Sequence, residues 1–193
     1  MTATTTRTVE AVRRMPGVEG FWVLIAGDLG VFTLLFGSFM AARSDKLAEF
    51  EQARHALDVT HGGLNTLLLL TSSWCVARAL QSARQGDAAA LRWLQFGIAG
   101  GVAFAASKVV EYAVEVHAGH TPTSGDFFMY YFAVTGIHLF HVLVGCVVLS
   151  VFLSRWRSRG IATQLAGFES AACFWHMVDL LWVLIFPLLY LTR

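Results

Sequence analysis

Five apolar stretches, each long enough to cross a lipid bilayer, constrain the fold of this 193-residue chain more than any other feature. A helix needs about 20 apolar residues to cross about 30 Å of hydrocarbon. The stretches are uninterrupted and lack the alternation of barrel strands. The predicted spans cover approximately residues 18–42, 61–83, 91–117, 127–153 and 167–191. The sequence therefore predicts an all-α fold, a polytopic integral membrane five-helix bundle in residues 18–193 after a polar segment, 1–17.

Composition agrees with a membrane location and excludes several other classes of protein. Hydrophobic residues make up 56% of the chain and charged residues only 14%, whereas soluble domains carry about 25% charged residues. The formal net charge of +1 is too small for a basic nucleic-acid-binding protein, and the apolar content is too high for a disordered chain. We therefore expect membrane lipid, and no nucleic acid, among the partners of this chain.

The distribution of lysine and arginine predicts the orientation in the membrane. Nine of these residues fall in the amino-terminal segment and in the connections between spans two and three and between spans four and five. Only four fall at the opposite ends of the spans. Because positively charged loops tend to stay in the cytoplasm, the amino terminus and segment 1–17 are predicted to be cytoplasmic and the carboxyl terminus to lie outside.

Ionisable residues inside or next to the predicted spans are the candidate functional residues. Placing one in hydrocarbon costs at least about 2.5–3.5 kcal/mol, so each needs a structural or functional explanation. Lys108 and Glu111 are three residues apart on one helix and are predicted to form a buried charge pair. The full set is Asp28, Lys108, Glu111, His138, His141, Glu169, His176 and Asp179.

A polar seam is predicted between the last two spans. Glu169, His176 and Asp179 fall on one helical stripe, and His138 and His141 share a face of the preceding span. A short connection makes the two helices antiparallel neighbours, and His138 and Asp179 lie equally far from its centre. The same is true of His141 and His176. We expect His138 to approach Asp179, and His141 to approach His176, near the middle of the membrane.

The first span contributes one carboxylate and a row of glycines. Asp28 lies about 15 Å from the cytoplasmic end, near the level of His141 and His176. Small residues let helices approach closely in lipid, and one stripe of this span consists of Gly20, Gly27, Gly30 and Gly37. The stripe therefore predicts close packing against another helix.

Three kinds of chemistry are compatible with the buried polar residues. The first is hydrogen bonding between helices that fixes the bundle. The second is haem ligation by His141 and His176, and the third is proton or ion passage along Asp28 and the histidines. A zinc site lacks support because His138 and His141 are not accompanied by a carboxylate motif. We therefore assign no metal ligand and no catalytic residue to this chain.

Two segments carry motifs at fixed spacing. They are GDFFMYYFAVTGIHLFHVLVG, residues 125–145, and GFESAACFWHMVDLLWVLIFPLLY, residues 167–190. Both segments resemble subunit III of the haem–copper oxygen reductases, the cytochrome c oxidase subunit III family. The family patterns are TG-x-H-x-x-H-V-x-x-G, which begins here at Thr135, and GFE…WH-x-V-D-x-x-W, which begins at Gly167. Weaker matches are LNT at 64–66 and EY at 111–112.

The sequence differs from the usual family member at two points. The family usually has seven helices, and the first two are missing here, so the chain looks more like the short five-helix proteins that accompany nitric oxide reductases. The family carries a carbodiimide-reactive glutamate in its first shared helix, and Asp28 stands at the matching place. The resemblance therefore implies a proton-related or lipid-related role for Asp28.

For function, the resemblance implies an accessory, non-catalytic subunit of a respiratory haem–copper oxidoreductase in a bacterial inner (plasma) membrane. The subunit would stabilise catalytic subunit I and support proton uptake. Haem and copper are expected in that partner and not in this chain, and bound phospholipid is expected on an open face of the bundle. Three alternatives stay open: a nitric oxide reductase accessory subunit, a bis-histidine membrane cytochrome and a proton-conducting membrane protein.

Overall fold

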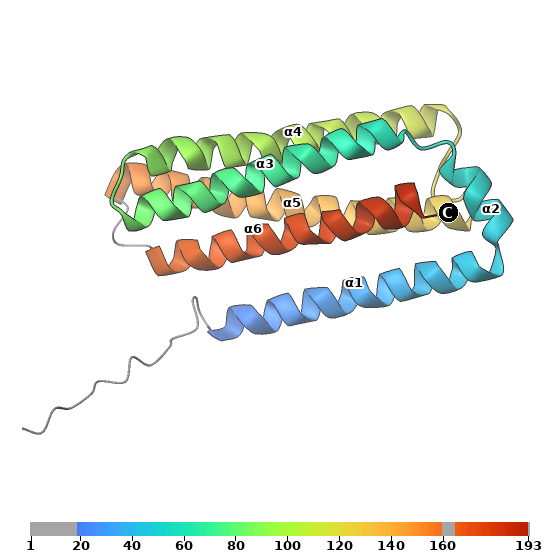
Figure 1. Cartoon of the computed structure of the whole chain (residues 1–193), viewed down its shortest axis with the longest axis horizontal. Helices are drawn as coiled ribbons and strands as arrows, with labels where there is room; N and C mark the ends of the chain where they lie inside the picture. The colour runs from blue at the N-terminus through green and yellow to red at the C-terminus, as the bar shows by residue number, and fades with distance from the viewer. Residues whose placement is uncertain (1–18, 160–164, 193) are drawn as a thin grey trace, which may run out of the picture.

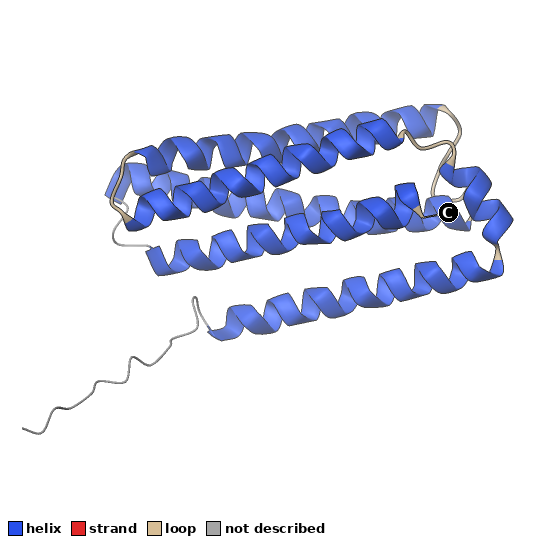
Figure 2. Cartoon of the chain, viewed as in Figure 1, coloured by secondary structure: helices blue, strands red, loops and turns tan. Residues whose placement is uncertain are grey.

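The computed structural model of the protein describes residues 19–159 and 165–192, and every regular element in these ranges is a helix (Figures 1 and 2). The all-α prediction is therefore confirmed for this part of the chain. The predicted amino-terminal segment 1–17 lies outside the described residues. The elements are α1 (Glu19–Asp45), α2 (Leu47–Arg54), α3 (Val59–Arg84), α4 (Ala89–His117), α5 (Asp126–Arg159), α6 (Leu165–Phe186) and the π-helix η2 (Pro187–Leu191).

Helices α3 to α6 lie side by side and alternate in direction, and α1 runs along the side of the bundle formed by α5 and α6 (Figure 1). The short helix α2 crosses one end and joins α1 to α3. Its Phe50 is buried against Phe39 and Phe127, with ring centroids 5.5 and 5.7 Å apart. Lys46, just before α2, donates a 2.8 Å hydrogen bond to Asp126 at the start of α5. These contacts hold the α1–α2 junction against the bundle.

Four helices in the described ranges are long and apolar enough to span a membrane: Trp22–Asp45, Ala89–His117, Asp126–Ser158 and Leu165–Leu191. The chain is thus a multi-pass membrane protein, but α3 does not meet this composition criterion. The reason is that α3 carries polar residues such as Asn65, Ser72 and Ser73, and these side chains are buried against other helices. The predicted count of five spans is therefore not confirmed by composition, and the predicted orientation stays a prediction.

The turn between α3 and α4 follows the local chemistry of the sequence. Gly86 follows the end of α3 with a φ of 69°, a conformation that other residues rarely adopt. The amide of Asp87 donates to the backbone carbonyl of Ser82 at 2.9 Å and closes the turn. Beyond it, Ser72 donates a 2.6 Å hydrogen bond to the carbonyl of Gly97. The two helices therefore pack closely over their length.

The helix α6 lies at the centre of the packing, and its large side chains determine where its neighbours carry glycine. Trp175 and Trp182 are fully buried. A Cβ atom added to Gly145 of α5 would lie only 2.6 Å from Cε3 of Trp175. By contrast, a Cβ at Gly27, Gly30 or Gly37 of α1 would meet no atom within 4 Å. The prediction that this glycine stripe packs closely against another helix is therefore wrong for these three positions within the described chain.

The carboxyl-terminal helix ends in a π-helix because Pro187 has no amide hydrogen to continue the α-helical pattern. The next turn is wider, and the amide of Thr192 donates to the carbonyl of Pro187 at 2.9 Å. Tyr190 is fully buried in this turn, and its carbonyl accepts a 3.2 Å hydrogen bond from Arg54 of α2. The π-helix thus directs the Tyr190 side chain into the interior.

We predict that Gly145→Ala destabilises the protein by about 1–3 kcal/mol, the usual cost of inserting an atom into a packed core. The matched control is Gly37→Ala, which adds the same methyl group where space is open. It is expected to leave stability unchanged or to raise it by up to about 1 kcal/mol, because alanine favours helix. Thermal unfolding of the full chain in detergent, followed by circular dichroism, measures both. Equal effects of the two variants would contradict this account of the α5–α6 contact.

Candidate functional site

The most polar feature of the interior is a cluster of four residues, Lys108, Glu111, Tyr131 and Tyr190, which we call the charged core. Lys108 is 0% exposed, and its ammonium lies 2.9 Å from Glu111 Oε1 and 3.2 Å from each tyrosine hydroxyl. Tyr131 donates a 2.6 Å hydrogen bond to the same carboxylate oxygen, and Tyr190 also donates to it. The predicted Lys108–Glu111 pair is confirmed, and it joins α4, α5 and η2.

Aromatic rings surround the buried ammonium group. Lys108 Nζ lies 4.9 Å from the ring centroid of Tyr131, 5.2 Å from that of Tyr112 and 5.3 Å from that of Trp182. The negative faces of such rings attract a cation, and the attraction is larger where water is excluded. The carboxylate, the two hydroxyls and the rings together replace the hydration shell that Lys108 loses on burial.

A chain of hydrogen bonds leads from the charged core to the surface at His61. Asn65 donates to Glu111 Oε2 at 3.4 Å, and Ser107 donates to the side-chain oxygen of Asn65 at 2.6 Å. The Nε2 atom of His61 lies 2.9 Å from the Ser107 hydroxyl and 3.6 Å from Glu111 Oε2. The His61 side chain is 33% exposed. Asp58 positions this histidine by capping α3 through the amides of Thr60 and His61.

The two weak sequence motifs meet in this network. The Asn65 of LNT contacts the Glu111 of EY. The tyrosine of EY, Tyr112, lies 2.6 Å from the hydroxyl of Thr135, which opens the TG motif of α5. The structure therefore explains three of the motifs by direct contact. Sequence reasoning missed Asn65, Tyr131 and Tyr190 as partners of the pair, because no spacing rule relates residues on four different elements.

The predicted seam between α5 and α6 does not form as predicted. His138 is fully buried between the rings of Phe104 and Trp182, at centroid distances of 5.7 and 5.2 Å. In the described part of the chain neither of its ring nitrogens has a hydrogen-bond partner, and neither does Oδ1 of Asp179. The predicted approach of His138 to Asp179 therefore produces no hydrogen bond in this part of the chain.

The predicted seam does not form because the polar stripe of α6 faces α3 and not α5. His176 Nδ1 lies 2.6 Å from the hydroxyl of Ser73, and Trp182 donates a 3.0 Å hydrogen bond to the hydroxyl of Thr66. Counting residues from the connecting loop sets the depth of a side chain but not the rotation of its helix about its own axis. The prediction that this stripe faces α5 is therefore wrong.

His141 faces α1, where it meets Asp28. Its Nε2 atom lies 3.4 Å from Asp28 Oδ1, and its Nδ1 atom lies 2.8 Å from the carbonyl of Ile137. The side chains of His141 and Asp28 are 15% and 24% exposed. The prediction that these two residues share one depth is confirmed. The predicted approach of His141 to His176 is not seen as a hydrogen bond in the described ranges, because each histidine contacts a different helix.

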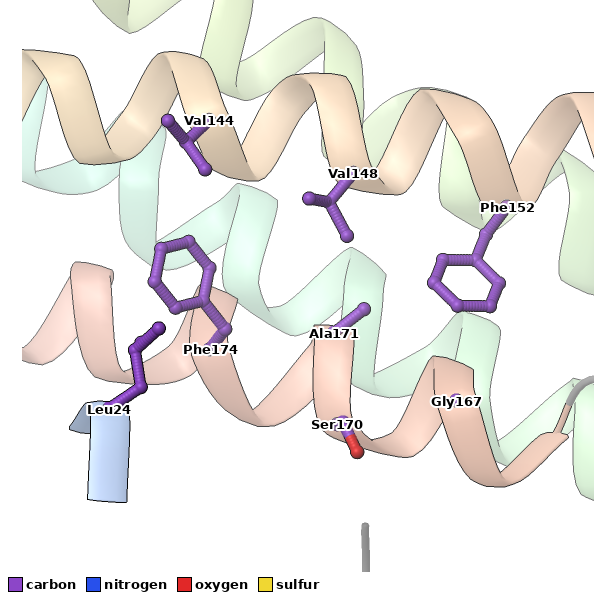
Figure 3. Close-up of a pocket in the computed structure, with 8 residues that line it drawn as sticks. All are labelled: Leu24, Val144, Val148, Phe152, Gly167, Ser170, Ala171 and Phe174. Atoms are coloured by element: carbon purple, nitrogen blue, oxygen red, sulfur yellow. The ribbon is translucent and has the colours of Figure 1, made fainter. Parts of the chain in front are cut away.

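An apolar cavity of about 280 Å³ lies beside the Asp28–His141 contact, between α1, α5 and α6 (Figure 3). Phe174 lines the cavity, and its ring centroid is 6.3 Å from that of His141. The one hydroxyl in the lining, Ser170, donates back to the carbonyl of Ala166. The cavity is lined by Leu24, Val144, Val148, Phe152, Gly167, Ser170, Ala171 and Phe174. It offers an apolar surface and no reactive group.

Ion pairs join elements at each end of the bundle. Arg84 at the end of α3 donates two hydrogen bonds to Oε1 of Glu169, at 2.8 and 3.0 Å. Glu169 therefore lies outside the buried network and ties α6 to α3. At the opposite end, the hydrogen bond with Asp126 raises the pKa of Lys46, and the charges of Asp126 and Glu49 add to the effect. Both ends are thus held by charge pairs in polar surroundings.

Of the three kinds of chemistry considered, the arrangement favours hydrogen bonding that cross-links the helices. Ring nitrogens of His141, His176 and His61 lie close to Asp28, Ser73 and Ser107, respectively. These contacts account for three of the histidines without a cofactor, whereas the fully buried His138 has no hydrogen-bond partner in the described chain. Within residues 19–159 and 165–192, no group of three or more His, Cys, Asp or Glu residues could hold a metal ion. The charged core also has no vacant position for a metal cation, because the ammonium group of Lys108 occupies the position beside Glu111.

Comparison with known proteins gives consistent matches over nearly the whole chain. The model of the family described as cytochrome c oxidase subunit III matches residues 20–192. The chain is 30% identical over 175 residues to cytochrome c oxidase subunit 3 of Bacillus subtilis, covering 89% of this chain and 84% of that protein. It is 30% identical over 181 residues to the subunit 3 of Synechocystis, with 92% and 75% covered. It is 27% identical over 176 residues to cytochrome bo(3) ubiquinol oxidase subunit 3 of Pseudomonas putida, with 90% and 84% covered.

We predict that Glu111→Gln destabilises the chain by about 3–5 kcal/mol, because it leaves the Lys108 charge buried without its counter-ion. Adding Lys108→Met to this variant is expected to recover a large part of the loss, since the unpaired charge is then gone. Thermal unfolding of the full chain in detergent gives the three values.

Arg84→Gln serves as the control for this experiment. It breaks the Arg84–Glu169 ion pair, in which the arginine side chain is 55% exposed, and a pair so exposed contributes about 0–1 kcal/mol. If Glu111→Gln cost no more than Arg84→Gln, the charged core would not be the principal electrostatic constraint on the bundle.

Proposed function

Because this chain belongs to the cytochrome c oxidase subunit III family, we propose that it is an accessory, non-catalytic subunit of a respiratory haem–copper oxidase. The observation that carries the proposal is the family match over residues 20–192, which covers all the described helices except the first residue of α1. Relatives at 27–30% identity are named as subunit 3 of cytochrome c oxidases and of a ubiquinol oxidase. The names of these relatives favour an oxygen-reducing partner over a nitric oxide reductase.

In this proposal haem and copper reside in the catalytic partner, subunit I, and this chain stabilises that partner. The internal chemistry supports such a division. The hydrogen bonds of Tyr131 and Tyr190 to Glu111, the His176–Ser73 contact and the Trp182–Thr66 hydrogen bond all join helices of this chain to one another. These contacts use polar groups to hold the helices together, which supports a structural role for this chain.

We also propose that α3 crosses the membrane, which gives five crossings. Its buried face is polar, with Asn65 only 1% exposed, and its outer face is apolar, with Leu64 and Leu67 57% and 61% exposed. A helix with apolar residues outside and polar residues inside suits a lipid environment better than water. Figure 1 shows α3 alongside α4 and antiparallel to it. If α4 crosses the membrane, α3 therefore crosses it as well.

The charge distribution supports the orientation with the amino terminus in the cytoplasm of a bacterium. Arg78, Arg84, Arg92, Arg155 and Arg157 all lie toward one end of the bundle, the end where α3 meets α4. The opposite end holds fewer basic residues. Positively charged ends stay in the cytoplasm, and the bacterial relatives favour the plasma membrane.

A role in proton uptake is proposed for the Asp28–His141 contact. Asp28 is one of the few carboxylates within a span, and its side chain is 24% exposed at the side of α1. His141 supplies a second group that can hold a proton at 3.4 Å. A carboxylate and an imidazole at this distance can exchange a proton, which is the property that a proton-collecting surface needs.

We predict that the tagged chain, purified in mild detergent, brings with it a larger subunit that carries the haem absorption. A strain lacking this chain should keep the metal-centre spectrum of the partner but lose activity during turnover. The measurement is oxygen consumption over time together with the optical spectrum. Recovery of a coloured chain free of other subunits would contradict the proposal.

We predict that Asp28→Asn lowers the proton uptake rate of the assembled complex, whereas Asp28→Glu retains it because the carboxylate is kept. Glu169→Gln is the control, since Glu169 pairs with Arg84 at the bundle end and lies apart from Asp28. Stopped-flow measurement with a pH dye reads the rate, and co-purification confirms that each complex is intact. Equal rates for all the variants would remove the proton role and leave the scaffold role in place.

A further inference from the structure

A further cavity lies at the end of the bundle where α2 meets the connection between α4 and α5 (Figure 1). Its volume is about 310 Å³, at the lower end of the usual range of about 300–1,000 Å³ for ligand sites. Its lining includes Glu49, Gln52, His120, Ser124, Phe127 and Phe128. Apart from the two phenylalanines, these residues lie outside the four apolar helices. We call this feature the α2 cavity.

The α2 cavity contains a carboxylate with no close partner in the described chain. A Cβ atom added to Gly125 would lie 3.4 Å from Glu49 Oε1, which places this carboxylate against the α4–α5 connection. The ion-pair partner of Glu49, Lys46, lies 3.9 Å away and donates its 2.8 Å hydrogen bond to Asp126 instead. The Glu49 side chain is 50% exposed. Its oxygens are therefore free to accept hydrogen bonds from a group outside the chain.

Aromatic rings form another part of the lining. His120 stacks on Phe128, with ring centroids 4.4 Å apart and an angle of 10° between the planes. The Nδ1 atom of His120 lies 2.7 Å from Glu115 Oε2, and this contact fixes the orientation of the imidazole. Phe128 covers one face of the imidazole, yet the His120 side chain is still 31% exposed. The imidazole therefore offers a rigid planar surface to a group in the cavity.

The charged groups around the α2 cavity are predominantly negative. Glu49, Glu115 and Asp126 supply three carboxylates, whereas Lys46 supplies one ammonium group. The net charge of these four groups and His120 is −2 when the imidazole is neutral and −1 when it is protonated. A cationic group that enters the cavity is therefore attracted in either protonation state.

We propose that the α2 cavity receives an arginine side chain of a neighbouring subunit, with the guanidinium group against the Glu49 carboxylate and the His120 ring. A guanidinium group carries five N–H donors in a planar fork that matches a carboxylate, and its flat faces stack on aromatic rings. The amide oxygen of Gln52 is a further acceptor for these donors. A lysine ammonium would pair with the carboxylate but would not stack on the ring, so arginine fits this lining better.

The proposal rests on the proposed function, because another subunit supplies the arginine. The cavity lies next to the ends of the apolar helices and not along them, so a loop of a neighbouring subunit reaches it without entering hydrocarbon. The two proposals fail in different ways. If the chain formed no complex, the proposed function would be wrong. If the complex formed and its stability did not depend on Glu49, only the present proposal would be wrong.

The charge requirement is tested on the intact complex, by the rate at which this chain dissociates after dilution in detergent. Glu49→Gln is expected to speed dissociation about tenfold, because a charge-assisted pair of hydrogen bonds is lost. Glu51→Gln is the matched control, since Glu51 lies on the same helix, is 48% exposed and pairs with Arg54 of its own chain. It is expected to leave the rate unchanged. Thermal unfolding of each variant confirms that it is folded.

The identity of the occupant is tested by cross-linking. Gln52→Cys, labelled with benzophenone maleimide, is expected to capture an arginine-containing peptide of another subunit in the complex. Leu47→Cys is the control, because Leu47 is 53% exposed on a different face of α2 and does not line the cavity. Changing the captured arginine to glutamate is expected to speed dissociation as Glu49→Gln does. Combining that change with Glu49→Arg is expected to restore slow dissociation, because the pair is then reversed.

Three results would overturn the proposal. The first is an equal dissociation rate for the wild-type chain and Glu49→Gln. The second is an equal acceleration by Glu51→Gln, because the effect would then follow the overall charge of α2. The third is failure of Gln52→Cys to capture an arginine-containing peptide, because a different group or solvent would then occupy the cavity.

Discussion

The buried pair of Lys108 and Glu111 is the interaction on which the rest of the arrangement depends. A charge in hydrocarbon costs at least about 2.5–3.5 kcal/mol, and this cost is met only if several elements converge on the pair. The α5 helix supplies Tyr131, the terminal π-helix supplies Tyr190 and α3 supplies Asn65. Because each partner comes from a different element, satisfying the pair fixes four elements relative to one another. In a bilayer, apolar side chains pack as well against lipid tails as against another helix, so apolar contact alone does not specify which helices pack together. The convergence of polar groups on this pair supplies that specificity.

The sequence allowed prediction of the features that depend on position along a helix, and it failed for those that depend on rotation. The Lys108–Glu111 pair follows from a spacing of three residues, and the shared depth of Asp28 and His141 follows from counting residues along each helix. Whether His176 faces α5 or α3 is decided by rotation of α6, which residue counting does not determine. Its true partner, Ser73, is a small polar residue whose role no spacing rule could identify.

The placement of polar residues explains why α3 does not meet the composition criterion for a membrane span. Its buried positions hold Asn65, Ser72 and Ser73, which lower its mean hydropathy, while its exposed positions hold leucines. The mean hydropathy averages the polar and the apolar face of the helix, so it reveals neither. Soluble helices show the opposite pattern, with polar residues outside. This inverted pattern is the observation on which the proposed membrane crossing of α3 rests.

The two external sides of the bundle differ in what they can bind, and the difference follows from packing. On one side, α1 is joined to the bundle by the Asp28–His141 contact and, at its end, by Lys46 and Asp126, and its glycines meet no other side chain in the described chain. Open glycines let another helix approach closely, which supports the proposed association of this chain with a larger subunit. On the other side, Arg78 of α3 and Arg92 of α4 form no ion pair with a carboxylate in the described chain, whereas Arg84 pairs with Glu169. Internal packing therefore leaves a different feature unused on each side, open glycines on one and arginines without a counter-ion on the other.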